Sequence, residues 1–472
     1  MACMDTRHAE PACWTFDADL LRRYDRPGPR YTSYPSAPQF TDSFGAADLA
    51  DAARAGNVGA SSRPLSLYVH VPFCHSPCFY CGCNRRITRD PAAGASYLAQ
   101  LRQEIALVAA LVDPRRPVVQ LHLGGGTPNF LSAAQLGQLL DTLGQQFRFG
   151  DAASRDFSIE LDPRHSTPGD IAALAAMGFN RASLGVQDFD PAVQAAINRL
   201  QSVEETAALV GACRAHGLRS VNIDLIYGLP LQTLEGFGRT LEQVIAMRPD
   251  RLAVYGYAHM PQLFRAQRQI DPAQLPDAEG RLALLGLAVR TLEAAGYVYI
   301  GMDHFALPHD ALAIAQRRGG LHRNFMGYTT HAQTDLFGLG VSAISHVGDC
   351  FSQNHRDQEA WAASLAGGAL PVWRGRRMDQ DDVIRADVIQ RLMCHGKVEF
   401  DAVGRAHGIE FRDYFAPCLR ALAPLACDGL VRVQPDGLEV TPRGRGLLRV
   451  VAMRFDRYLQ VPAGAPHHSR AI

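Results

Sequence analysis

The sequence predicts an α/β protein built on a partial parallel (β/α)6 barrel, with an N-terminal arm and a mostly helical C-terminal domain. Short β-like runs alternate with longer amphipathic segments from Leu65 to about Ser345. Polar residues and glycines stand where those runs end, and the alternation stops after about residue 350. Repeated β–α units favour a parallel sheet with right-handed crossovers. A chain of 472 residues is longer than one ordinary core requires, so more than one domain is expected.

Eight runs read as strands. They are Leu67–Val71, Val118–Leu123, Phe157–Leu161, Ala182–Val186, Val221–Ile226, Leu252–Tyr257, Val298–Gly301 and Leu339–Ile344. Between them, Ser96–Val112 and Leu234–Met247 carry apolar residues at helical spacing. Asp190 followed by Pro191 indicates a helix N-cap with proline at the first helical position. Eight runs could close a barrel, but we favour six main strands with the remaining runs flanking them.

The segments on either side of the β–α region differ from it. We expect an N-terminal arm or lid over residues 1–50, the β–α domain over 51–350 and a winged-helix-like domain over 351–472. Three prolines and three tyrosines make Leu21–Pro35 an extended segment, either a surface arm anchored by its tyrosines or a lid. The C-terminal part predicts a helix near Glu359–Leu365, two or three helical pieces over Asp379–Ala426, a hairpin over Leu430–Val440 and a last helix over Gly444–Leu459.

The composition excludes several classes of protein. Lys plus Arg and Asp plus Glu number 47 each, so no net charge attracts nucleic acid or an anionic membrane. No segment has the apolar length of a signal peptide or a membrane span. Eleven cysteines, an odd and clustered set, argue against a secreted disulfide framework. We therefore expect a cytoplasmic protein that binds neither nucleic acid nor membrane. We also expect it to be a monomer.

Four of the cysteines, Cys74, Cys78, Cys81 and Cys83, follow the first predicted strand directly. Thiolates select zinc, copper(I) or iron–sulfur clusters. The spacing C-x3-C-x2-C-x-C fits neither the paired C-x2-C knuckles of structural zinc sites nor the common ferredoxin spacings. Three thiolates at spacings x3 and x2 can hold three irons of a [4Fe–4S] cluster and leave the fourth iron open. A structural zinc site is the alternative metal site.

Glycines and polar side chains end several other predicted strands. The segment Gly124-Gly125-Gly126-Thr127-Pro128 follows the second strand, and ligands of parallel α/β sheets bind at the carboxyl ends of strands. Further polar residues at strand ends are Glu160, Gln187, Asp188, Asp224 and His259. Successive carboxylates suit the hydroxyl groups of a ribose, although each one alone could equally be a hydrogen-bonded core residue.

With these motifs the chain resembles the radical S-adenosylmethionine superfamily and, within it, the bacterial oxygen-independent coproporphyrinogen III oxidases of haem biosynthesis. The resemblance covers nearly the whole chain except roughly the first 15 and last 10 residues. It is carried by Pro29–Pro35, Tyr68–Asn84, Leu121–Pro128, Glu160–Arg164, Gly185–Phe189, Asn198-Arg199, Asn222–Pro230, Ala258–Pro261, Gly301–Ala306, His322–Tyr328 and Gly340–Ser345. Asn129 and the tail Pro466-His467-His468 receive no interpretation.

The resemblance implies a set of cofactors and ligands. Cys74, Cys78 and Cys81 would ligate one [4Fe–4S] cluster, and Cys83 would not. The family binds two molecules of S-adenosylmethionine. The residues matching contacts of the cluster-bound molecule are Tyr68, Gly125, Glu160 and Ile344. Those matching contacts of the second molecule are Tyr80, Gly126, Thr127, Gln187, Arg199, Asp224 and Ala258.

The implied reaction is oxidative decarboxylation of the ring A and ring B propionates of coproporphyrinogen III to vinyl groups, which gives protoporphyrinogen IX. A 5′-deoxyadenosyl radical would take hydrogen from each propionate, so that the cofactors rather than protein acids or bases carry the hard step. An electron donor and an electron acceptor, both unidentified, would be partners. Because the substrate is a tetracarboxylate, Arg30, Arg85, Arg86 and Arg323 are candidates for binding it.

Two other functions compete with this one. A haem-chaperone relative in the same superfamily has a similar cysteine loop but lacks the fourth cysteine and the Pro-Arg-Tyr-Thr-Ser-Tyr-Pro arm, both of which are present here. Nucleic-acid binding through the C-terminal end is the other. That end carries Arg443, Arg445, Arg449, Arg454 and Arg457. The zero net charge of the chain disfavours it.

Overall fold

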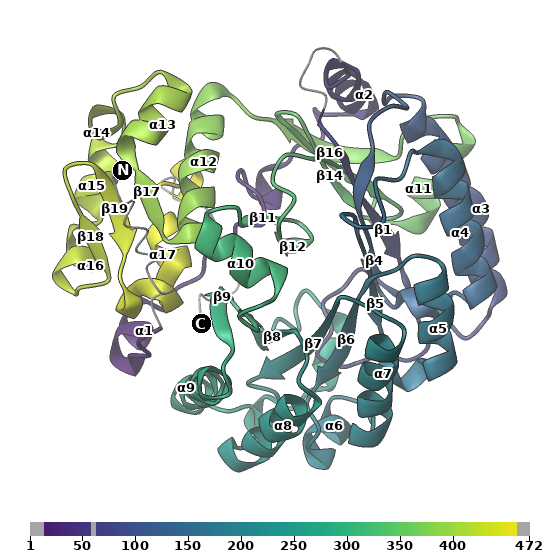
Figure 1. Ribbon diagram of the computed structural model, residues 1–472, viewed down its shortest axis with the longest axis horizontal. Helices are drawn as coiled ribbons and strands as arrows, with labels where there is room; N and C mark the ends of the chain where they lie inside the picture. Colours follow the sequence, from purple (N-terminus) through teal and green to yellow (C-terminus); the bar gives the residue numbers. More distant parts are fainter. Residues whose placement is uncertain (1–13, 58–62, 460–472) are drawn as a thin grey trace, which may run out of the picture. The chain divides into compact units, whose positions relative to one another are not determined.

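The computed structural model describes residues 14–57 and 63–459, which form two compact units (Figure 1). The first, here called the sheet unit, comprises residues 35–285 and 331–383. The second, the C-terminal unit, gathers the described parts of residues 1–34, 286–330 and 384–472. The division of the chain into an arm, a β–α domain and a C-terminal domain stays a prediction. Within the described ranges, no helix has both the length and the apolar character needed to cross a bilayer.

The sheet unit is organised around parallel strands. In spatial order they are β13 (Asp335–Leu339), β1 (Leu65–Val71), β4 (Val118–Gly125), β5 (Asp156–Leu161), β6 (Arg181–Gln187), β7 (Ser220–Tyr227) and β8 (Arg251–Gly256). Strands β1 and β4 to β8 also follow one another along the chain, which confirms the six main strands of the predicted (β/α)6 fold. Beyond β13 the sheet continues in antiparallel strands β14 (Ile344–Val347), β15 (Cys350–Asn354) and β16 (Val372–Arg377).

A layer of helices covers one face of this sheet (Figure 1). Its members are α3 (Ala92–Ala109), α4 (Ala133–Gln146), α5 (Pro168–Ala176), α6 (Pro191–Ala196), α7 (Val203–Ala215), α8 (Leu234–Met247) and α11 (Gln358–Ala366). The helices from α3 to α8 lie between consecutive parallel strands, as the alternation predicts. Asp190 caps α6 by accepting hydrogen bonds from the N–H groups of Ala192 and Val193, which confirms the predicted cap. Helices α2 (Ala46–Ala55) and α9 (Ala278–Ala294) precede and follow this series.

Side chains along the parallel strands alternate between two environments. Leu67, Leu121 and Ile223 are fully buried at 0% exposure and belong to the apolar core. Residues one position away, such as His122 and Asp224, are polar and only partly buried. Since successive side chains of a strand point to opposite faces, the apolar set packs on the helices and the polar set lines the other face.

The predicted strand over Leu339–Ile344 is wrong. Strand β13 ends at Leu339 and β14 begins at Ile344, and the residues between them form a turn. Gly340 and Ser342 adopt positive φ angles of 97° and 62° there, which extended strands do not contain. The apolar character of the stretch continues through the turn and conceals it.

The C-terminal unit contains a small antiparallel sheet and several short helices. The sheet runs in the order β17 (Lys397–Glu399), β19 (Gly437–Val440) and β18 (Val431–Val433), so the predicted hairpin is confirmed. The helices are α1 (Ala18–Tyr24), α10 (Ala311–Arg318), α12 (Gln380–His395), α13 (Phe400–His407), α14 (Phe411–Tyr414), α15 (Ala416–Ala421), α16 (Ala423–Cys427) and α17 (Leu448–Ala452). Two further antiparallel pairs are β9 (Val298–Gly301) with β10 (His304–Ala306) and β11 (His322–Asn324) with β12 (Gly327–Thr329).

Two helical predictions need correction in this unit. The last helix, predicted over Gly444–Leu459, reduces to α17, with 3-10 turns at Pro442–Leu447 and Arg457–Leu459. Proline and two glycines in the first of these segments do not sustain an α-helix. The region of two or three predicted helical pieces is divided further, because residues such as Gly408 adopt a left-handed conformation that ends a helix.

The N-terminal arm is anchored within the C-terminal unit. The Tyr31 hydroxyl donates to the buried Asp456 carboxylate at 3.0 Å, and the Tyr34 hydroxyl accepts the Arg457 N–H at 3.1 Å. Both tyrosines are buried. Arg449 is buried as well and donates to the carbonyl of Pro29. This arginine of the basic C-terminal end therefore serves packing. The role of the arm as a lid stays a prediction.

Candidate active site

A cavity of about 280 Å³ lies in the sheet unit where the parallel strands end at their carboxyl termini. Its wall includes Cys74, Cys78, Tyr80, Cys81, Cys83, Arg85, Gly125, Gly126, Thr127, Glu160, Asp162, Arg164, Ser183, Gln187, Arg199, Asp224 and Tyr255. Every predicted cluster ligand and S-adenosylmethionine contact lines this cavity except Tyr68, Ala258 and Ile344. The strand ends therefore bring together residues that lie far apart in the sequence.

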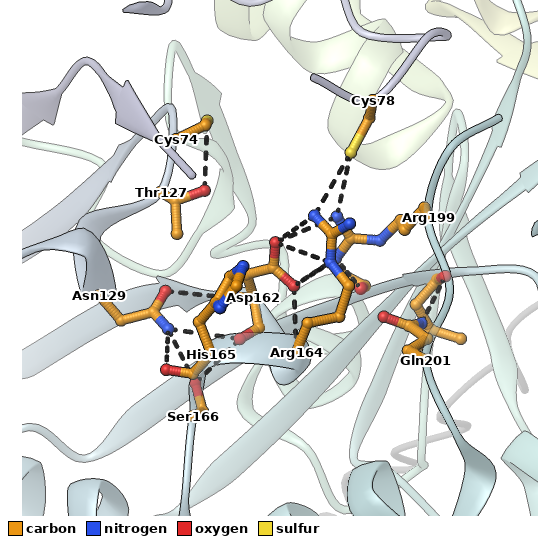
Figure 2. Close-up of polar contacts among 12 residues, drawn as sticks. Cys74, Cys78, Thr127, Asn129, Asp162, Arg164, His165, Ser166, Arg199 and Gln201 are labelled. Carbon is orange, nitrogen blue, oxygen red and sulfur yellow. Dashed lines mark hydrogen bonds and ion pairs between the residues drawn. The ribbon is translucent and has the colours of Figure 1, made fainter. Parts of the chain in front are cut away.

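The predicted cluster ligands each have a different partner at the cavity wall. Cys74, which ends β2 (Phe73–Cys74), has its Sγ 3.3 Å from the Thr127 hydroxyl. The Sγ of Cys81 accepts the N–H of Cys83 at 3.4 Å. Cys78 is buried, and Figure 2 shows guanidinium groups directed at its sulfur. Within the described ranges, no three or more His, Cys, Asp and Glu side chains lie close enough together to hold a single metal ion. A cluster has a different requirement, since each of its irons takes its own thiolate.

The electrostatic environment separates the thiols. Burial raises the pKa of Cys74 to about 11. A hydrogen bond from the Cys83 thiol is the main reason that the pKa of Cys81 lies well below its usual range, and the positive charge of Arg85 adds to the effect. The same hydrogen bond raises the pKa of the donor, Cys83. Since only thiolates ligate metals, this arrangement favours Cys81 over Cys83 as a ligand.

The glycine segment at the end of β4 lies directly against the cysteine loop. A Cβ at Gly126 would stand 2.8 Å from the carbonyl oxygen of Phe73, and one at Gly125 would stand 2.7 Å from the His70 ring. Gly125 also has a φ of 118°, which side chains disfavour, and its N–H donates to Glu160 at 3.1 Å. The segment thus presents bare backbone to the cavity, as close approach of a ligand requires.

Hydrogen-bonded polar side chains connect the strands on the cavity side of the sheet. His122 lies 2.7 Å from the Ser158 hydroxyl and 3.2 Å from a Glu160 oxygen. Asn222 donates to Asp224 at 2.8 Å. The residues of this set that the sequence did not predict are His122, Ser158, Ser183 and Asn222. Each stands two positions before a residue of a predicted motif on the same strand, so the two-residue period of strands was an available signal.

The two carboxylates of this polar set differ in their tendency to ionise. Burial raises the pKa of Asp224 to about 6, and the nearby negative charge of Glu160 adds to this. Burial acts in the same direction on Glu160, but hydrogen bonds from His122 and Gly125 outweigh it and leave the pKa of Glu160 below its usual value. Glu160 is therefore an anion at neutral pH, whereas Asp224 titrates slightly below neutrality.

Asp162 holds two arginines at the cavity wall (Figure 2). Its carboxylate accepts Arg164 Nη2 at 2.6 Å and Arg199 Nη2 at 3.2 Å. Although burial opposes it, the charges of Arg199 and Arg164 lower the pKa of Asp162 to about 2. The Nε of Arg199 is buried and has no hydrogen-bond partner among the described residues. Asp162 and Arg164 were not predicted as site residues.

The predicted residues outside the cavity lining lie next to it. The Tyr68 hydroxyl is 3.0 Å from His70 Nδ1, and its ring stacks on His122 with centroids 5.9 Å apart. Tyr68 is paired in register with Gly338, where a Cβ would collide with the backbone of Ile344. Tyr68 and the start of β14 are therefore neighbours at one edge of the site.

Ala258 is connected to the cysteine loop through a glutamine that the sequence did not predict. The buried Gln267 donates from Nε2 to the carbonyl of Tyr80 at 2.9 Å and to the carbonyl of Ala258 at 3.1 Å. Its side-chain oxygen accepts the N–H of Met260. Gln267 thus holds two segments of the predicted site together. No local motif marks it, and its partner Tyr80 lies 187 positions away in the sequence.

The arginines proposed to bind the substrate are in different settings. Arg85 lines the cavity and donates to the Cys78 carbonyl at 3.0 Å, whereas Arg86 is exposed on β3 (Arg86–Ile87). Arg30 pairs with Asp303 in the C-terminal unit. The guanidinium of Arg323, in the same unit, lies 4.6 Å from the centre of the Tyr328 ring. Arg85 is the candidate that the cavity itself contains.

Comparison with known proteins gives the family. Residues 68–244 match the model of the radical SAM superfamily, and residues 378–447 match that of the HemN C-terminal domain. An oxygen-independent coproporphyrinogen III oxidase from Pseudomonas aeruginosa is 50% identical over 448 residues, 94% of this chain and 96% of the relative. The chain belongs to the oxygen-independent coproporphyrinogen III oxidase family. The Escherichia coli (strain K12) oxygen-independent coproporphyrinogen III oxidase is 47% identical, with 97% and 98% of the two chains covered.

The structure of coproporphyrinogen III oxidase (HemN) from Escherichia coli, a radical SAM enzyme, agrees with this assignment. It matches with a TM-score of 0.89 and 46% identity over 94% of this chain and 99% of that chain. The predicted family, fold class and enzyme class are confirmed. As an oxygen-independent coproporphyrinogen III oxidase, the chain is an oxidoreductase whose cofactors are a [4Fe–4S] cluster and S-adenosylmethionine.

The cavity fits the cofactors of this oxidase family. Three thiols at its wall provide the donor set of a cluster with one open iron, and guanidinium groups nearby balance the negative charge of thiolates. Gly125 and Gly126 pack closely on His70 and the start of the cysteine loop and line the cavity with backbone that carries no side chain. The unsatisfied Nε of Arg199 is a donor suited to a carboxylate.

Proposed function

We propose that the chain decarboxylates the ring A and ring B propionates of coproporphyrinogen III at this cavity and so forms protoporphyrinogen IX. The carrying observation is that Cys74, Cys78 and Cys81 share one cavity with the backbone of Gly125 and the carboxylate of Asp224. When bound, the [4Fe–4S] cluster and S-adenosylmethionine supply the one-electron radical chemistry. The protein binds and orients the reacting groups and excludes water.

In this proposal Cys74, Cys78 and Cys81 ligate the cluster, and Cys83 supports Cys81 without binding iron. The hydrogen bond from Cys83 to Cys81 and the opposite displacement of their pKa values support this division. Tyr80 lies between two of the ligands and packs against an apolar cluster that includes Val193. Its ring therefore shields the cluster from water.

The proposal includes two molecules of S-adenosylmethionine. The cluster-bound one contacts Tyr68, Gly125, Glu160 and Ile344. The second contacts Tyr80, Gly126, Thr127, Gln187, Arg199, Asp224 and Ala258. An ionised Asp224 can accept hydrogen bonds from both hydroxyls of a ribose. Arg199, whose charge Asp162 already orients, can meet the carboxylate of the cofactor.

The partners are also part of the proposal. Coproporphyrinogen III is the substrate, and Arg85 is the arginine placed to face one of its carboxylates. An electron donor and an electron acceptor of unknown identity complete the reaction. The monomeric state, the cytoplasmic location and the absence of nucleic-acid or membrane partners stay predictions.

The function can be tested by anaerobic reconstitution of the protein with iron and sulfide. Coproporphyrinogen III, S-adenosylmethionine and a reductant are then added, and the porphyrins are separated after oxidation. The proposal expects protoporphyrin to accumulate with turnover. A stable haem adduct without any conversion of coproporphyrinogen would instead support the haem-chaperone function.

A further inference from the structure

Two arginines from different strand ends converge on the sulfur of one predicted cluster ligand (Figure 2). Arg199 Nη1 lies 3.4 Å and Arg164 Nη2 lies 3.5 Å from Cys78 Sγ. Arg199 already has a proposed partner in the second S-adenosylmethionine. Arg164, in the 3-10 turn Pro163–His165 after β5, has no assigned role, although its side chain is only 14% exposed and faces the cavity.

The guanidinium of Arg164 is held in place by the carboxylate of Asp162, two residues earlier. Asp162 accepts Arg164 Nε at 3.0 Å and Nη2 at 2.6 Å, a two-point contact that fixes the plane of the guanidinium. The carboxylate of Asp162 is ionised at any working pH because its pKa is about 2. A free surface arginine would lose this orientation through side-chain rotation.

Asn129 fixes the turn that carries both residues. Its side-chain oxygen accepts the N–H of Asp162 at 3.0 Å, and its amide donates to the carbonyl of His165 at 3.0 Å and to the hydroxyl of Ser166 at 2.9 Å. Figure 2 shows these contacts on one side of Asp162 and the arginines on the other. Asn129, uninterpreted in the sequence, thus ties the 3-10 turn Pro128–Phe130 after β4 to the Arg164 turn.

We propose that Arg164, oriented by Asp162 and Asn129, is a positioning residue that donates to the cluster-ligating sulfur of Cys78 and raises the reduction potential of the cluster. Reduction adds a negative charge to the cluster. A fixed cation and an N–H donor beside a ligand sulfur stabilise that charge, and hydrogen bonds to sulfur are among the protein's means of setting cluster potentials. The inference rests on the proposed role of Cys78 as a ligand.

The test is a redox titration of the reconstituted cluster, followed by electron paramagnetic resonance, in Arg164→Gln and Arg164→Lys. Arg164→Gln removes the charge, and the equilibrium constant for one-electron reduction is expected to fall about tenfold, a midpoint about 59 mV more negative. Arg164→Lys keeps the positive charge, so its midpoint potential should be less negative than that of Arg164→Gln. The matched control is Arg239→Gln on α8, where an exposed arginine pairs with Glu235 and the midpoint should not change.

Each outcome decides the inference. A midpoint equal to that of the wild type in Arg164→Gln, or equal falls in the two Arg164 variants, would overturn it. If Arg164→Gln retains no iron, Asn129→Leu gives the same comparison, since it frees the turn while leaving the arginine present. A wild-type midpoint in Asn129→Leu would then reject the inference. Full iron and sulfide in Cys78→Ala would reject the ligand role of Cys78, which is a failure of the proposed function and distinguishable from the others.

Discussion

The N–H of Cys83 donates to the sulfur of Cys81 at 3.4 Å, and the neighbouring Cys83 thiol lowers the pKa of the Cys81 thiol. This contact supports the proposal that the fourth cysteine of the motif assists a ligand and does not itself bind iron. A thiolate at Cys81 is stabilised by donors from the residue two positions later. In the proposed function, Cys81 is therefore a ligand and Cys83 supports it.

Substitution of Cys83 should reduce the retained iron less than substitution of Cys81. We expect Cys83→Ala to retain most of the iron of the wild type after anaerobic reconstitution, with a cluster that is lost faster in air. Cys81→Ala should retain little iron, because one of three thiolates is missing. Iron and sulfide assays measure both variants. Equal iron loss in the two variants would assign Cys83 as a ligand.

S-adenosylmethionine affinity should depend on the charge of Asp224. Because the pKa of Asp224 is raised to about 6, its carboxylate is protonated and loses its negative charge as the pH falls through that value. Binding that requires the ionised form then weakens up to about tenfold for each pH unit below the pKa. Equilibrium dialysis with the reconstituted protein on both sides of pH 6 measures this effect. In Asp224→Asn the affinity should be low and independent of pH; a pH dependence equal to that of the wild type would contradict the role.

Ionisation of Asp224, which favours cofactor binding in this account, should destabilise the folded protein. A carboxyl whose pKa is raised by folding favours the folded state below its unfolded pKa, and this contribution is lost as pH rises through the folded value of about 6. Asp224→Asn removes the buried charge, so above pH 6 it should unfold at a higher temperature than the wild type. Thermal unfolding without added cofactor measures the difference. A lower unfolding temperature above pH 6 would show that the hydrogen bonds from Ser183 and Asn222 outweigh the cost of the charge.

Gly126 should tolerate no side chain. A Cβ there would meet backbone atoms of Phe73 and Pro72 within 3.0 Å, and backbone cannot rotate away. Gly126→Ala should displace the cysteine loop, lower the retained iron and destabilise the fold by about 1–3 kcal/mol. Gly137→Ala in α4 is the control, since the nearest atom to its Cβ would be 3.9 Å away. That variant should be stabilised by up to about 1 kcal/mol with full iron. Equal iron in both variants would contradict the close approach.

Gln267 should matter for cofactor binding although it does not line the cavity. Gln267→Ala leaves the carbonyls of Tyr80 and Ala258 without their shared donor, which should destabilise the protein by about 1–3 kcal/mol. It should also raise the KM for S-adenosylmethionine more than it lowers kcat, because Ala258 loses its position. The exposed Gln274 provides the control, and Gln274→Ala should behave as the wild type. Lower stability with an unchanged KM would limit Gln267 to a structural role.

The sequence was sufficient to predict the strands whose apolar runs begin and end clearly. Strand β7 is an example, since its run lies between turn residues. Strand β13 was missed because it starts at Asp335, whose buried carboxylate pairs with Arg116. A pattern of apolar residues does not reveal that a charged residue is buried in an ion pair. At the C-terminal end, apolar residues at helical spacing outweighed the Gly444-Arg445-Gly446 signal, and the helix there is short.

The site residues could be predicted where they belong to a short sequence motif. Cysteine spacing, consecutive glycines and carboxylates at strand ends are local signals. The contacts of Arg164 with Cys78 and of Gln267 with Tyr80 could not be found in this way, because these partners lie far along the chain. Arg164 contacts a cysteine 86 positions away, and Gln267 contacts Tyr80 at a separation of 187. Such residues become visible only when the strands bring distant segments together.

The most direct test of the central claim is to measure carbon dioxide, 5′-deoxyadenosine and protoporphyrinogen IX in one anaerobic reaction. The reaction contains the reconstituted protein, coproporphyrinogen III, S-adenosylmethionine and a reductant, with Cys78→Ala in parallel. The account predicts two molecules of carbon dioxide for each protoporphyrinogen IX, together with 5′-deoxyadenosine, and none of the three from Cys78→Ala. Cleavage of S-adenosylmethionine with coproporphyrinogen III recovered unchanged would contradict it.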